Sequence, residues 1–127
     1  MIQTITTNRR LVLAERPQGA PTESTFTLKT EDVPSPQEGE MLLRTEFLSF
    51  DPYMLGRMSD APSYAPPVNN GDVMVGGTVA QVETAKLDGF MKGDWLLSAN
   101  GWQDYAPSNG YSGSLVGRKG KRPLLMK

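Results

Sequence analysis

Glycine and proline recur so often in this sequence that they leave little room for long helices. The 127 residues include 13 glycines and 10 prolines, and the apolar runs between them are of strand length. Proline interrupts both helices and central strands, and glycine favours turns. The spacing therefore predicts short strands joined by turns and argues against a helical bundle.

Six short runs have the apolar or alternating pattern of strands, at residues 10–14, 26–29, 40–50, 73–82, 95–97 and 102–105. In the third run, Met41, Leu43, Thr45 and Phe47 share one face. The glycine pair at residues 76–77 predicts a bulge or a close approach of the backbone. Together the runs predict an antiparallel or mixed β-barrel.

One helical turn is expected between the third and fourth runs. Asp51 is a good helix N-cap and Pro52 is favoured at the first helical position, so residues 53–55 are expected to turn and Gly56 to end the turn. A proline-rich loop over residues 59–72 follows.

The ionisable residues exclude several classes of function. The chain has no cysteine and no histidine, which excludes disulfides, zinc sites built on those residues and Ser-His-Asp catalysis, and we expect no metal site. Residues 1–117 carry a net charge of −6 and the last ten carry +5, so the acidic body disfavours nucleic acid and anionic membranes. No apolar run approaches the roughly 18 residues of a membrane span, and no signal-peptide core is present. We expect a cytoplasmic protein.

Four segments resemble a known family in their order and spacing: 8–21, 48–58, 74–82, and 93–97 with 101–105. They include Asp51-Pro52-Tyr53-Met54, the glycine pair and Gly93-Asp94. The sequence is similar to the N-terminal catalytic domain of zinc-independent medium-chain reductases, in the branch of alkenal, prostaglandin and curcumin reductases. One position departs from this branch, because Leu55 stands where an arginine is usual.

The resemblance implies a mainly β, GroES-like, partly open barrel with short helical turns. It implies a catalytic or substrate domain over residues 9–107. The polar, Thr-rich residues 1–8 are expected to form a flexible lead-in, and the basic residues 108–127 a flexible tail. The resemblance also implies an NADPH-dependent oxidoreductase that delivers hydride to the C=C bond of an enone or enal, and homodimers of the intact protein. Because the 127 residues contain no Rossmann domain, we expect a truncated chain that binds NADPH weakly and is inactive alone.

The candidate site residues follow from this chemistry. Hydride addition builds negative charge on the carbonyl oxygen, and a tyrosine phenol stays protonated at neutral pH and can donate to it. Tyr53 and Tyr64 are the catalytic candidates, and the substrate candidates add Met54 and Arg57. The resemblance places Pro52 and Tyr53 beside the cofactor. Alternatively, both tyrosines pack against the domain without a catalytic role, and Arg57 is a solvated surface residue.

Two other functions stay open. A free-standing barrel could act as a ligand- or partner-binding module without catalysis. A barrel could instead bind single-stranded nucleic acid through aromatic residues and the basic tail, although the acidic body argues against it.

Overall fold

The protein is mainly β, as the sequence predicted. The computed structural model describes residues 7–59, 66–110 and 114–117. The one α-helix in this part of the chain is the short α1, Tyr53–Arg57, and a single 3₁₀ turn precedes β2 at Glu23–Thr25. The strands are β1 (Thr7–Leu13), β2 (Phe26–Asp32), β3 (Met41–Leu48), β4 (Thr78–Ala85), β5 (Trp95–Ser98), β6 (Tyr105–Ser108) and β7 (Ser114–Gly117).

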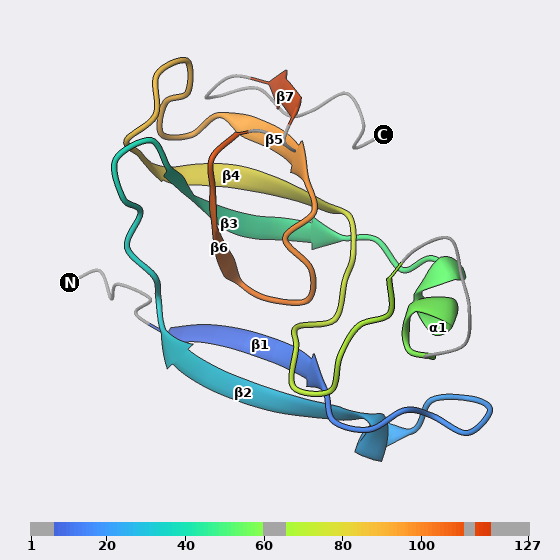
Figure 1. Ribbon diagram of the computed structural model, residues 1–127. Helices are drawn as coiled ribbons and strands as arrows, with labels where there is room; N and C mark the ends of the chain where they lie inside the picture. The colour runs from blue at the N-terminus through green and yellow to red at the C-terminus, as the bar shows by residue number, and fades with distance from the viewer. Residues whose placement is uncertain (1–6, 60–65, 111–113, 118–127) are drawn as a thin grey trace.

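The strands form two open antiparallel sheets (Figure 1). Strands β1 and β2 form a hairpin, and the other sheet has the order β6-β3-β4-β5-β7. The hairpin lies beneath the larger sheet, and α1 lies at the end of the structure to which β3 leads. Strand β7 lies within the segment expected to be a tail and pairs with β5.

The segment that precedes β6 connects the two sheets. Leu11 N donates to Trp102 O at 2.9 Å, and Asp104 N donates to Arg9 O at 3.1 Å. This segment thus runs along β1 before it enters the larger sheet beside β3. The result is the partly open barrel that the family resemblance implied.

Two apolar clusters form the core. One lies on the larger sheet and contains Met41, Leu43, Ala80, Val82 and Leu96. The other connects the hairpin to α1 and contains Leu13, Met54, Met58, Val68 and Met74. The second cluster positions α1, since two of its five members come from this helix and the residue after it.

Two strand predictions were wrong in part. The expected strand 73–82 begins only at Thr78, and Val73 makes just an isolated bridge to Val12. Phe47 was expected to share a face with Met41, but Met41 is buried whereas Phe47 is 45% exposed. A register shift between Thr45 and Phe47 breaks the alternation of faces in β3, which explains this exposure.

Among the described residues, no helix has the length and apolar character needed to cross a membrane.

Candidate functional site

The chain turns from β3 into α1 through a compact hydrogen-bonded corner. Ser49 Oγ donates to Asp51 Oδ2 at 2.7 Å, and Met54 N donates to Asp51 O at 3.1 Å. The predicted side-chain cap by Asp51 was wrong: Pro52 is the N-cap residue, and no side chain caps the helix. The Asp51 carboxylate accepts a hydrogen bond from Ser49, and the backbone carbonyl of Asp51 accepts the first hydrogen bond of the turn.

Helix α1 extends one residue past the glycine that was expected to end it. Gly56 has no positive φ, so it does not adopt the left-handed conformation that makes glycine a helix stop. The helix reaches Arg57, which places Tyr53 and Arg57 four residues apart on one side of it. Of the predicted site residues, Tyr53, Met54 and Arg57 therefore lie on one short helix, and Pro52 directly precedes it.

The two sides of α1 differ in exposure. Met54 and Met58 are both 4% exposed and pack in the cluster with Leu13 and Val68. Tyr53 and Leu55 face outward and are 43% and 49% exposed. The helix thus presents a phenol and an aliphatic side chain at the surface, while Met54, a predicted substrate contact, faces the core.

Large apolar side chains are exposed on both sides of this corner. We call Phe47, Phe50, Tyr53 and Leu55 the corner patch, since all four lie within nine consecutive residues and each is more than 40% exposed. Phe50 is the most exposed, at 72%, and its ring meets Trp102 edge-on at a centroid distance of 5.4 Å. The Trp102 ring also contacts Phe26 at 5.2 Å. Phe47 and Phe50 were not among the predicted site residues.

Arg57 makes a structural contact next to this patch. Its Nε donates to Pro66 O at 2.7 Å, and its carbonyl oxygen accepts from Val68 N at 2.7 Å. Arg57 thus connects α1 to the segment that returns at residues 66–68. Tyr64, the second catalytic candidate, lies outside the described residues.

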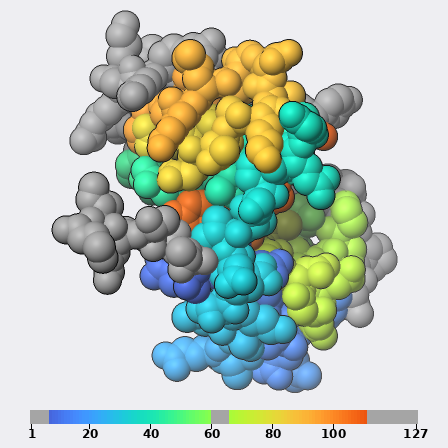
Figure 2. Space-filling view, turned by 90° about the vertical axis from the view of Figure 1, so that its left-hand side faces the viewer, coloured from blue at the N-terminus to red at the C-terminus, as the bar shows by residue number. Residues whose placement is uncertain are grey.

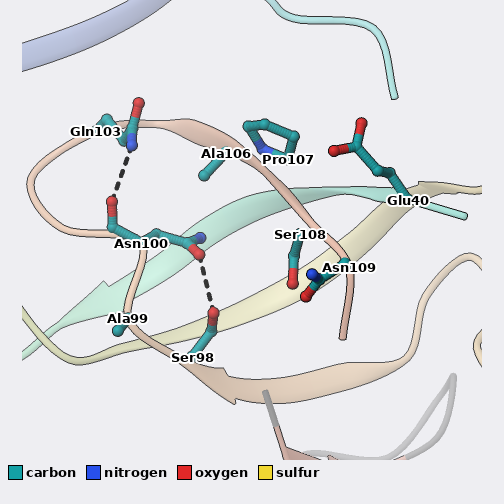
Figure 3. Close-up of a pocket in the computed structure, with 9 residues that line it drawn as sticks. All are labelled: Glu40, Ser98, Ala99, Asn100, Gln103, Ala106, Pro107, Ser108 and Asn109. Carbon is teal, nitrogen blue, oxygen red and sulfur yellow. Dashed lines mark hydrogen bonds between the residues drawn. The ribbon is translucent and has the colours of Figure 1, made fainter. Parts of the chain in front are cut away.

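A separate polar groove of about 400 Å³ lies between β6, the loop before it and the residue preceding β3 (Figure 3). Gln103 Nε2 donates to Asn100 O at 2.9 Å, and Ser98 Oγ donates to Asn100 Oδ1 at 3.0 Å. Asn100 Nδ2 donates to Thr45 Oγ1 at 3.0 Å. The groove contains no predicted site residue, and these polar groups mainly bond to one another, which favours a structural role.

An ion pair joins β1 to the segment before β6. Arg9 Nε and Nη2 donate to the two oxygens of Asp104 at 2.8 and 3.0 Å. This guanidinium holds the pKa of Asp104 below its ordinary range. Burial raises the pKa of the neighbouring Tyr105 phenol, which lies on β6, away from α1. Neither perturbed group lies on α1.

No group of three or more potential metal ligands occurs in the part of the chain that the structure describes.

Comparison with known proteins gives one matching family, described as the N-terminal domain of oxidoreductase, over residues 9–116. An NADPH-dependent curcumin reductase from Escherichia coli is 57% identical over 103 residues, which cover 81% of this chain and 30% of that protein. Prostaglandin reductase 1 from Bos taurus is 38% identical over 92 residues, which cover 72% of this chain and 26% of the relative. The chain thus spans less than a third of these curated relatives.

The fold also matches solved structures. The crystal structure of CurA from Vibrio vulnificus is similar with a TM-score of 0.86 and 55% identity, covering 91% of this chain and 34% of that one. The same protein in complex with NADPH matches with a TM-score of 0.84 over the same shares.

Proposed function

The chain belongs to the family of N-terminal oxidoreductase domains, in the zinc-independent medium-chain reductase branch, and we propose that it is the substrate domain of an NADPH-dependent reductase. Its proposed reaction is the reduction of the C=C bond of an α,β-unsaturated carbonyl compound. Relatives named as NADPH-dependent curcumin reductase and prostaglandin reductase support the reductase class. The enone chemistry is the expectation drawn from the family resemblance.

This proposal rests on the exposure of Tyr53 on α1, whose other side packs in the core. Its side chain is 43% exposed, whereas the adjacent Met54 is 4% exposed in the core. Hydride arrival at the β-carbon of an enone moves charge to the carbonyl oxygen. A phenol that donates to this oxygen binds the transition state more tightly than the substrate. We assign this donation to Tyr53, with Tyr64 as a second proposed donor.

Among the described residues, we find a place only for the nicotinamide ring of the cofactor, the end that carries the hydride. Pro52 and Tyr53 are both exposed at the start of α1, where a flat ring could lie against them. The glycine pair cannot form a helix N-terminal phosphate site, because Gly77 leads directly into β4. Bound NADPH would supply the hydride, and this chain would hold the substrate against it. The CurA structure in complex with NADPH supports the choice of cofactor.

The corner patch indicates an apolar substrate. Phe50 and Leu55 are exposed within three residues of the proposed donor along the chain, and exposed apolar surface commonly forms ligand sites or interfaces. Leu55 stands where an arginine is usual in the branch, so the patch lacks a cation at that position. Arg57 is the proposed polar contact, although its Nε already donates to Pro66 O. We therefore propose a neutral enone or enal rather than an anionic one.

A domain exchange tests this function directly. Residues 9–107 of this chain would replace the matching segment of the Escherichia coli reductase, to which this chain is 57% identical. We expect the chimera to reduce curcumin with NADPH at a rate comparable to that of its parent.

Thermal melting and NADPH titration of the chimera serve as controls for folding and cofactor binding. A chimera that folds and binds NADPH, yet does not reduce curcumin, would contradict the proposal. That result would favour the alternative of a ligand-binding module without catalysis.

A further inference from the structure

A second arginine, outside the proposed site, bridges the end of α1 to a distant segment. Arg16 lies in the connection between β1 and β2, 42 residues before Met58 along the chain. Its Nη1 donates to Met58 O at 2.8 Å and to Val68 O at 3.1 Å. Met58 is the C-cap residue of α1. The last carbonyls of a helix lack partners within the helix, and an arginine side chain can supply one.

These contacts belong to a larger set of hydrogen bonds. Val68 N donates to Arg57 O, and Arg57 Nε donates to Pro66 O, each at 2.7 Å. Hydrogen bonds therefore join the end of α1, at residues 57–58, directly to residues 66–68. Figure 2 shows the yellow-green residues that follow position 65 packed beside the blue and cyan residues of the β1–β2 hairpin.

Apolar packing alone fixes the orientation of α1 weakly. The helix has five residues, too few to be stable in isolation. Its buried contacts come from Met54 and Met58, and methionine is unbranched and tolerates several packing arrangements. Hydrogen bonds are directional, so the two from Arg16 restrict how the helix turns and slides on the core.

We propose that Arg16 is a positioning residue that sets the direction of the Tyr53 ring by holding the last turn of α1 against Val68. This inference rests on the proposed role of Tyr53 as hydrogen-bond donor. A small displacement of a positioned donor lowers kcat more than substrate binding. Arg16 itself touches neither substrate nor cofactor in this scheme.

The first test is hydrogen exchange on the 127-residue chain. Arg16→Met keeps a long side chain but removes every donor, Arg16→Lys keeps a cation, and Lys92→Met removes an exposed cation as the control. We expect the amides of Met58 and Val68 to exchange about tenfold faster in Arg16→Met, with Arg16→Lys intermediate and Lys92→Met unchanged. Slow amides in β3 and β4 report whether each variant stays folded, and Arg16→Lys serves if Arg16→Met does not fold. Unchanged exchange at the end of α1 in the folded variants would overturn the proposal.

The second test measures kinetic coupling in the chimera described above. We expect Arg16→Met to lower kcat about tenfold with little change in KM, and to have almost no further effect once Tyr53 is replaced by Phe. Equal effects of Arg16→Met in both backgrounds would also overturn the positioning role. If Tyr53→Phe leaves kcat unchanged, the proposed role of Tyr53 as donor fails, while the exchange result still reports on the Arg16 contacts.

Discussion

The backbone of Gly76 lies so close to the side chain of Met54 that a Cβ atom at position 76 would stand 3.2 Å from Met54 Cε. The same Cβ would stand 2.8 Å from Leu48 Cδ1 and 3.2 Å from Trp102 Cδ1. This glycine therefore lets the end of β3, α1 and the segment before β6 meet at one point. The close backbone approach predicted for the glycine pair is confirmed at its first member.

Gly76→Ala should lower the free energy of unfolding by about 1–3 kcal/mol, because an added methyl group overpacks this contact. The matched control is Gly77→Ala, where a Cβ would meet no atom within 4 Å and φ is not positive. It should change stability by no more than about 0.5 kcal/mol. Urea denaturation of both variants measures the difference, and equal losses would contradict the close contact at Gly76.

Asn8 should be among the most sensitive polar residues. Its side chain is 1% exposed, its Oδ1 accepts from Tyr105 N, and its Nδ2 donates to Tyr105 O. Asn8→Ala leaves both backbone groups without these partners and should cost about 2–4 kcal/mol in the free energy of unfolding. Asn70→Ala, at an exposed turn, should cost less than about 0.5 kcal/mol. Similar losses at the two positions would show that Asn8 does not connect β1 to β6.

The Arg9–Asp104 pair should make stability depend on pH. Arg9 lowers the pKa of Asp104 in the folded protein, so the ion pair contributes stability above the ordinary aspartate pKa of about 3.9. That contribution is lost as the pH falls through the lower, folded-state pKa. The stability advantage of the native chain over Asp104→Asn should therefore be constant from pH 7 to about pH 5 and shrink below about pH 4.

Urea titrations at a series of pH values measure this advantage. At pH 7 it should also decrease in 1 M salt, because the pair is partly exposed. An advantage that grows as the pH falls would rule out the assigned ion pair.

Local sequence patterns predicted β1 to β5 and α1, because the alternation of side chains and the Asp-Pro pair act over a few residues. They therefore placed Tyr53 and Met54 on one short element, whereas Arg57 lies beyond the glycine that was expected to end it. They did not predict β7, and the expected strand 102–105 overlaps β6 only at Tyr105. They failed where distant contacts decide the structure. The exposure of Phe47 depends on a register shift against β4, and no local pattern marks such a shift.

The contacts of Asn8 and Arg16 were not predictable for the same reason. Asn8 bonds to a residue 97 positions away, and Arg16 reaches carbonyls 42 and 52 positions away. A lone asparagine in a strand and an arginine before a proline carry no local signal of these roles. The role of Tyr64 stays a prediction.

The measurement that tests the proposed mechanism most directly compares the kcat of the Tyr53→Phe and Tyr105→Phe variants of the chimera. Both changes remove one phenol hydroxyl, but Tyr53 is exposed on α1 whereas Tyr105 is buried in β6. Loss of one donor to a developing oxyanion lowers kcat by about 10²–10³-fold. We predict a fall of this size for Tyr53→Phe and a kcat for Tyr105→Phe close to that of the unmodified chimera. If Tyr53→Phe reduces curcumin as fast as the unmodified chimera, Tyr53 is not the donor and the proposed mechanism is wrong.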